Sequence, residues 1–129
     1  MAQKIPADLR YTKQHEWARV EGELLVVGIT DYAQEALGDI VYVDVGASGT
    51  ELDKDASFGA IESVKAAEDL YAPVAGTIAE TNEELKSAPE KINQAPYEHW
   101  LVKLSGFDKS EVDGLLDAAA YGAYLESLG

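Results

Sequence analysis

One lysine stands apart from the other basic residues in the middle of this sequence. Lys65 is the only basic residue between Lys54 and Lys86, and that interval holds seven carboxylates. They are Asp55, Glu62, Glu68, Asp69, Glu80, Glu83 and Glu84. Apolar, strand-like runs lie on both sides, so we expect Lys65 at the tip of a hairpin. An amine displayed in this way is one to which an enzyme can attach another group.

The neighbours of Lys65 argue against chemistry by the lysine itself. Lysine nucleophiles are activated by desolvation in an apolar pocket. Here Ala66 and Ala67 are small, and Glu68 and Asp69 are charged, so nothing would exclude water. The residues therefore favour an exposed attachment point over a Schiff-base lysine, with an unmodified, solvated lysine as the alternative.

Other catalytic groups are sparse. His15 and Glu16 could serve as acid and base in a cleft, or they could be solvated residues of a strand in which Trp17 packs. The sequence has no cysteine, and His15 and His99 do not form a zinc motif. We therefore expect no metal site. Because no partner motif would orient His15 and Glu16, we also expect no catalytic residue.

Composition limits the partners. The 129 residues carry a formal net charge of -14, which disfavours binding to nucleic acid and to anionic membranes. No apolar stretch is long enough to span a bilayer, and the N-terminus lacks a targeting pattern. We expect a cytoplasmic protein, or a mature form whose targeting segment has been removed.

Elements that could position Lys65 are predicted from local patterns. In the first half, strands are expected at residues 10–12, 16–20, 24–29 and 39–45, the third covered on both faces. A short helix is expected at residues 31–38, with Asp31 accepting N–H bonds at its start and Gly38 at its exit.

The second half contains the predicted hairpin. Its strands are expected at residues 58–64 and 70–78, with Pro73 forcing an edge position or a bend. Period-two alternation places Phe58, Ala60, Glu62 and Val64 on one face of the first strand.

The remaining segments predict a strand and short helices. Thr81 and Glu84 form a capping-box pattern before one helical turn, and residues 100–104 read as a strand. Helices are expected from residue 108, with Val112, Leu115 and Leu116 at helical spacing, and at residues 118–128. We predict one domain, residues 1–129, with a mainly β core at about 10–106 and helices at about 108–128.

A family resemblance rests on two blocks of sequence. The segment Glu62-Ser63-Val64-Lys65-Ala66, followed by residues 69–76, resembles the lipoyl-lysine signature of the glycine cleavage system H proteins. Residues 15–17, 28–38, 92–93, 96–97 and 115–117 are also similar to the family pattern, in order. Biotin carriers centre instead on a Met-Lys-Met tripeptide, which this chain lacks.

The resemblance implies a fold and a role. The fold would be a lipoyl-carrier barrel-sandwich hybrid of two small antiparallel sheets, with short helices and a helical C-terminus. Lys65 would carry covalent lipoate, with Glu62, Ser63, Val64 and Ala66 as the attachment loop. The protein would be a carrier and not an enzyme, shuttling an aminomethyl group during glycine breakdown.

The resemblance also implies partners. They are the glycine decarboxylase, the aminomethyltransferase, dihydrolipoamide dehydrogenase and a lipoate-attaching enzyme, with the carrier itself a monomer. An alternative is a lipoate relay that donates to other lipoyl domains. Glu16 and Asp69 match acidic positions near a cleft that shelters the loaded arm.

Three features depart from the family pattern. Gln14 stands where Ser or Asn is frequent, and Ala36 stands where some members have a histidine. The segment 96–100 is slightly shorter than usual. These departures affect the expected lining of the cleft and leave Lys65 unaffected.

Overall fold

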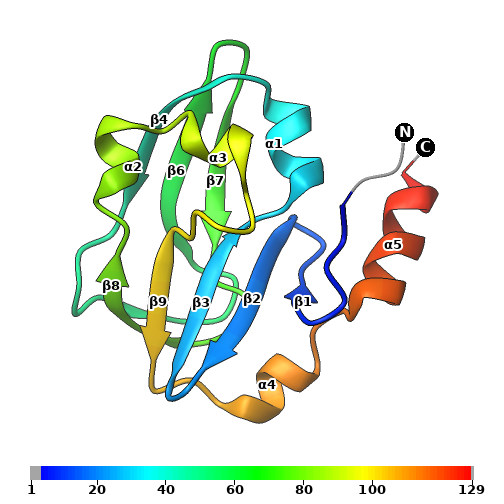
Figure 1. Cartoon of the computed structure of the whole chain (residues 1–129). Helices are drawn as coiled ribbons and strands as arrows, with labels where there is room; N and C mark the ends of the chain where they lie inside the picture. Colours follow the sequence, from blue (N-terminus) through cyan, green and yellow to red (C-terminus); the bar gives the residue numbers. More distant parts are fainter. Residues whose placement is uncertain (1–3, 129) are drawn as a thin grey trace.

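Two antiparallel β-sheets form the body of the structure, a computed structural model that describes residues 4–128 (Figure 1). The larger has the strand order β1-β2-β3-β9-β8-β5, and the smaller β4-β6-β7. The larger sheet comprises β1 (Arg10–Tyr11), β2 (Glu16–Glu21), β3 (Leu24–Ile29), β5 (Glu51–Leu52), β8 (Gly76–Thr81) and β9 (Val102–Ser105). The smaller comprises β4 (Ile40–Val45), β6 (Ser57–Ser63) and β7 (Ala67–Tyr71). The prediction of a mainly β chain with two antiparallel sheets is confirmed.

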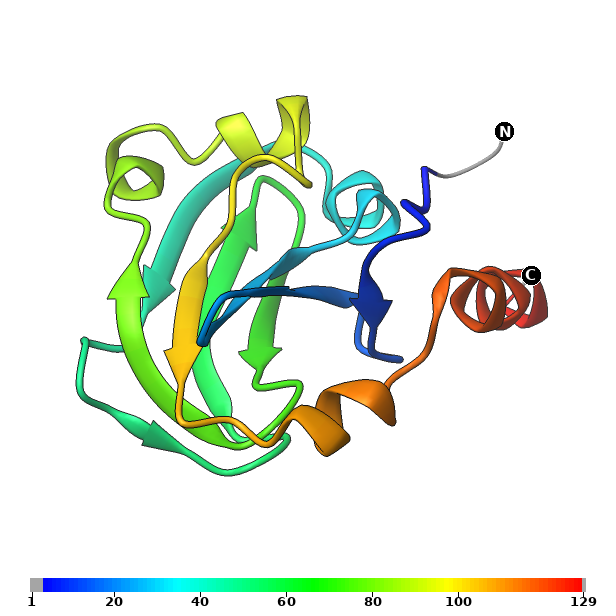
Figure 2. The same ribbon diagram turned by 60° about the horizontal axis from the view of Figure 1, so that its bottom comes forward.

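The main hydrophobic core lies between the two sheets, which face each other in Figure 2. The larger sheet contributes Leu25, Val27 and Leu104, among others, and the smaller contributes Ile61 and Leu70. Burial of each such side chain stabilises the fold by about 1.5–3 kcal/mol. The core therefore holds the β6–β7 hairpin against the larger sheet.

Strand β3 is covered on both faces, as its continuous apolar run predicts. Val27 points into the main core, whereas Val26 belongs to a second cluster with Trp17, Tyr11 and Tyr121. Period-two alternation of side chains explains this division. Trp17 pairs across the strands with Gly28, where an added Cβ would lie 2.6 Å from the indole ring.

Short helices surround the sheets. They are α1 (Asp31–Leu37), α2 (Glu84–Ser87), α3 (Lys91–Gln94), α4 (Lys109–Asp113) and α5 (Ala118–Ser127). Helix α5 lies beside β1, away from the smaller sheet (Figure 1). No helix within residues 4–128 is long and apolar enough to cross a membrane.

The first helix begins differently from the prediction. Its N-cap is Thr30, whose Oγ1 accepts a bond from the Ala33 N–H at 3.3 Å. Asp31 is already helical, and its Oδ1 accepts from the Gln34 side chain at 2.8 Å. The expected capping role of Asp31 is therefore wrong, while the predicted exit at Gly38 is confirmed.

The expected capping box before α2 is also wrong. Thr81 is the last residue of β8, and its Oγ1 donates to Glu83 at 2.6 Å instead of capping the helix. Helix α3 was not predicted. Helix α4 ends at Asp113, before Leu115, because Leu116 forms a β-bridge with Tyr11.

Two strand predictions need correction. The run at 70–78 is not one strand, because β7 and β8 belong to different sheets and the chain bends around Pro73. The alternation expected in β6 also fails, since Phe58 and Ile61 are both in the core. A register shift between Ser57 and Gly59 explains this, because an irregular pairing interrupts the period of two.

Candidate functional site

The β6–β7 hairpin presents Lys65 at its tip, as predicted. The Ser63 N–H donates to the Ala66 carbonyl at 2.8 Å, which closes a tight turn. The Ser63 hydroxyl oxygen accepts from the N–H groups of Lys65 at 3.3 Å and of Ala66 at 3.0 Å. A single serine therefore organises the backbone on both sides of Val64 and Lys65.

The Lys65 side chain is exposed and lies near the end of helix α1. It forms no ion pair with the described residues, 4–128. A Cβ built on Gly38 would lie 3.4 Å from Cε of Lys65, and Gly38 has a φ of 79°. Glycine at this position thus provides both the helix exit and the space beside the lysine.

The turn after α1 supports the hairpin tip. The Asp39 carbonyl accepts from the Val64 N–H at 3.1 Å. The Asn93 side chain holds this turn from α3: it donates to the Gly38 carbonyl at 2.8 Å and accepts from the Ile40 N–H at 2.9 Å. Sequence reasoning missed this role of Asn93, although Asn93 lies in a block that matched the family pattern.

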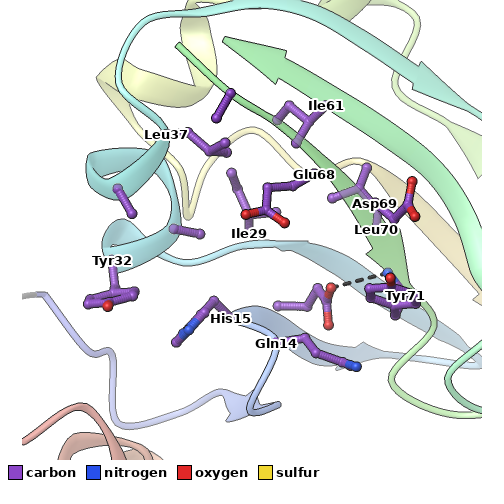
Figure 3. Close-up of a pocket in the computed structure, with 14 residues that line it drawn as sticks. Gln14, His15, Ile29, Tyr32, Leu37, Ile61, Glu68, Asp69, Leu70 and Tyr71 are labelled. Carbon is purple, nitrogen blue, oxygen red and sulfur yellow. Dashed lines mark hydrogen bonds between the residues drawn. The ribbon is translucent and has the colours of Figure 1, made fainter. Parts of the chain in front are cut away.

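A cleft of about 220 Å³ adjoins the hairpin (Figure 3). It lies between α1, the residues leading into β2, and β7. Apolar residues dominate its lining near α1. The lining residues are Gln14, His15, Glu16, Ile29, Tyr32, Ala33, Ala36, Leu37, Ile61, Ala66, Glu68, Asp69, Leu70 and Tyr71.

Glu16 is the buried acid of this cleft, only 2% exposed. Its carboxyl group accepts from the Thr12 hydroxyl at 2.7 Å and from the Tyr71 N–H at 3.1 Å. Desolvation nevertheless raises the pKa of Glu16 to about 7, with those two bonds acting in the opposite direction. Near neutral pH this group can therefore take up or release a proton.

Glu68, and not only Asp69, contributes a carboxylate to the cleft. The strand register places Glu68 in one row with Ile61 and Val43, which point toward the core. Asp69 falls in the alternate row, on the outer face of the sheet, and reaches the cleft only at its edge. In Figure 3 the Glu68 carboxylate points toward the middle of the cleft, and that of Asp69 lies further along the strand.

Helix α5 holds one wall of the cleft in place. The hydroxyl of Tyr121 lies 2.8 Å from Nδ1 of His15 and 2.8 Å from Oγ1 of Thr30. The His15 ring also packs against Tyr32, with ring centroids 4.5 Å apart. Burial lowers the pKa of His15. The backbone of His15 has a φ of 71°, in the left-handed region that a residue with a side chain rarely adopts. These contacts fix a strained residue rather than leaving it solvated.

The residues predicted from sequence thus fall into three places: the hairpin tip, the inside of the cleft, and the edge of the cleft, where Asp69 lies. Lys65, Ser63, Val64 and Ala66 form the tip, with Glu62 just before it on the exposed face of β6. Glu16 is inside the cleft. Within the described residues 4–128, no group of three histidines or carboxylates is arranged to hold a metal ion. Side chains alternate between the two faces of β7, so Glu68 lies on the same face as the buried Leu70. This spacing could have placed Glu68 on the cleft side from sequence alone.

A family model and individual relatives both match this chain, and both name the same family. The family model for the glycine cleavage H-protein matches residues 9–128. A glycine cleavage system H protein from Symbiobacterium thermophilum is 52% identical over 121 residues, 93% of this chain and 94% of the relative. One from Anaeromyxobacter sp. (strain K) is 49% identical over 124 residues, 95% and 97% of the two chains.

A solved structure is also similar. The crystal structure of a glycine cleavage system H protein from Mycobacterium marinum matches with a TM-score of 0.85 and 35% identity. The match covers 95% of this chain and 99% of that one.

Proposed function

Because this chain belongs to the glycine cleavage H-protein family, a family of lipoyl carriers, we propose that Lys65 is the residue that carries lipoate. The observation that carries the proposal is the exposed Lys65 amine at the tip of a hydrogen-bonded hairpin, beside a cleft. Glu62, Ser63, Val64 and Ala66 are the attachment loop in this proposal.

Attachment joins Nζ of Lys65 to the carboxyl carbon of an activated lipoyl group. The amine attacks the acyl carbon, the activating group leaves with the bonding electrons, and the original ammonium loses two protons in all. The exposure of Lys65 gives the attaching enzyme access, and the turn closed by Ser63 restricts where the amine can point.

The cleft suits an arm of this kind. Ile29, Leu37 and Leu70 offer an apolar surface to a hydrocarbon chain, and Ala36 leaves room for it. When bound, lipoate would supply a disulfide that is reduced as it accepts an aminomethyl group, and the dithiol left after transfer would then be oxidised back to the disulfide. The protein's own residues position the arm, and the surrounding enzymes perform the reactions.

Glu16 and Glu68 supply negative charge in the cleft, with Asp69 at its edge. A cationic amine that enters the cleft would favour the ionised form of Glu16, because an opposite charge offsets the cost of desolvation. We therefore assign to Glu16 and Glu68 the stabilisation of the cationic end of the loaded arm, with Asp69 as a weaker, peripheral contributor.

The proposal includes three partner enzymes of glycine cleavage: the decarboxylase, the aminomethyltransferase and dihydrolipoamide dehydrogenase. A lipoate-attaching enzyme is the fourth partner, and the protein itself is a monomeric, cytoplasmic carrier. A tethered arm keeps its cargo at high effective concentration for each partner. The two relatives described above are bacterial proteins, which supports this setting.

Intact mass spectrometry tests the proposal. The protein is incubated with a lipoate ligase, ATP and lipoate, next to the Lys65→Arg variant. We expect a gain of one lipoyl group in the wild type and none in the variant. A wild type that gains no mass, or a variant that gains as much, would contradict the assignment of Lys65. Assay of the loaded protein with the glycine decarboxylase then separates glycine cleavage from a pure lipoate relay.

The role of Glu16 is tested by the lifetime of the loaded arm. Non-enzymatic ammonia release is timed for the wild type, for Glu16→Gln and for Glu68→Gln. Faster release in both variants is expected, with the larger effect for the buried Glu16. Equal rates in all three proteins would refute the role of these carboxylates.

A further inference from the structure

An irregularity in β4 turns two large apolar side chains outward. In the pairing of β4 with β6, Ile40 lies opposite Ser63 and Tyr42 opposite Glu62, with a register shift between them. Val41 is therefore the extra residue of a bulge. Ile40 and Val43 point into the core, while Val41 and Tyr42 are 54% and 50% exposed.

These two side chains lie next to the hairpin tip. The Val64 N–H donates to the Asp39 carbonyl at 3.1 Å, which brings the tip to the beginning of β4. Val64 is 71% exposed. Val41, Tyr42 and Val64 are three of five exposed large apolar residues of the described chain, 4–128. Such grouping on a small protein is typical of an interaction site.

Acidic residues border this apolar group on the outer face of the smaller sheet. Tyr42 pairs with Glu62, which in turn pairs with Ala67. The next row holds Asp44, Ala60 and Asp69. Ala60 and Ala67 are small, and they line a shallow hollow of about 240 Å³ together with Glu62, Glu68, Asp69 and Tyr71.

We propose that this outer face, with Val41, Tyr42 and Val64 at its apolar centre and Glu62 and Asp69 at its acidic border, docks the enzyme that attaches the acyl group to Lys65. The inference rests on the proposed function. The attaching enzyme is the expected partner, because amide formation brings the active site of this enzyme to Nζ of Lys65 itself, beside Val64. The enzymes that act on the loaded arm meet the far end of the arm instead.

The chemistry of the face specifies the docking surface of that enzyme. Three apolar side chains fit an apolar recess, and tyrosine is frequent among residues that dominate binding energy. The carboxylates fit lysine or arginine side chains, of which one could enter the hollow that Glu62, Glu68 and Asp69 line. Charge at such a border acts mainly on the rate of association, so binding should weaken as salt increases.

The test uses the unloaded full-length chain with a lipoate ligase. The double variant Val41→Ser/Tyr42→Ser removes the apolar centre and leaves Lys65 and its loop intact. The matched control is Val20→Ser, which alters an apolar residue, 39% exposed, near the β2–β3 turn. Circular dichroism and thermal unfolding establish that each variant is folded. Attachment is followed by intact mass, and binding to the ligase without ATP is measured by calorimetry.

We expect the double variant to lose about tenfold or more in kcat/KM for attachment, through KM, with a matching loss of affinity. The Val20→Ser variant should behave as the wild type. Normal affinity and kinetics in a folded double variant would overturn the docking surface and leave lipoylation of Lys65 intact. Equal losses in both variants would overturn it too. A wild type that gains no lipoyl group would refute the proposed function itself.

If Val41→Ser/Tyr42→Ser does not fold, Glu62→Gln/Asp69→Asn changes only exposed carboxylates and provides the second test. A lower association rate with a weaker dependence on salt is expected. An unchanged rate and salt dependence would overturn the proposal.

Discussion

Replacing Glu16 with glutamine should change how the stability of this protein depends on pH. Desolvation raises the pKa of the buried Glu16 from its usual 4.5 to about 7. Between these values the folded protein binds more protons than the unfolded chain. The stability that Glu16 contributes relative to the uncharged glutamine is therefore fully present below about pH 4.5 and is lost as the pH rises toward 7. The shift of the pKa from 4.5 to about 7 corresponds to about 3 kcal/mol of unfolding free energy.

Urea unfolding at a series of pH values measures this effect, with the fluorescence of the buried Trp17 as one probe. The free energy of unfolding of the wild type minus that of Glu16→Gln should fall by about 3 kcal/mol between about pH 4 and pH 8. Other titrating groups cancel in this difference. Glutamine keeps an acceptor for the Tyr71 N–H but has no charge to desolvate.

A difference that stays constant within about 0.5 kcal/mol, or that increases with pH, would refute the reasoning. A constant difference would mean that the bonds from Thr12 and Tyr71 offset desolvation at this site, and an increasing one that they outweigh it. The same result would remove the proton exchange that we attribute to Glu16 in the cleft.

Three further predictions concern the supports of the site. Gly59→Ala should destabilise the fold by about 3 kcal/mol or more in urea unfolding, because the new Cβ would collide with the Asp44 carbonyl oxygen; unchanged stability would contradict this. Asn93→Ala should cost about 2–3 kcal/mol and speed amide hydrogen exchange at Val64, because the turn after α1 loses its side-chain bonds; normal exchange at Val64 would show that the turn is held otherwise. His15 should titrate by NMR below its usual 6.5, because burial disfavours its charged form, and a pKa at or above 6.5 would count against its packing.

Much of the strand pattern was accessible from local sequence. The apolar run at residues 24–29 predicts a strand covered on both faces, and it is one. The caps of α1 and α2 were misassigned, since a threonine or aspartate can bond to a backbone N–H or to a neighbouring side chain with similar ease. The bulges in β4 and β6 were not predicted, because they depend on pairing with a partner strand.

The functional site likewise combines features that local sequence predicts with features that depend on pairing between distant segments. The small neighbours of Lys65 indicate an exposed amine, and the amine is exposed. The roles of Glu68 and Asp69 were not separable by composition, because both are acidic and adjacent. Their positions in the ladder with β6 put one toward the cleft and the other toward the outer face. Asn93 acts across 53 residues of sequence on Ile40, a relation that no local pattern reveals.

The sequence by itself determined the isolated lysine, the acidic surroundings and the family to which the chain belongs. These depend on residue type and order along the chain, which sequence records directly. Only the tertiary structure decided that Glu16 is desolvated and that Lys65 lies over Gly38. It also decided that Tyr42 faces solvent beside the tip. Burial, pKa and exposure arise from packing between segments distant in sequence, so they exist only once the two sheets have come together.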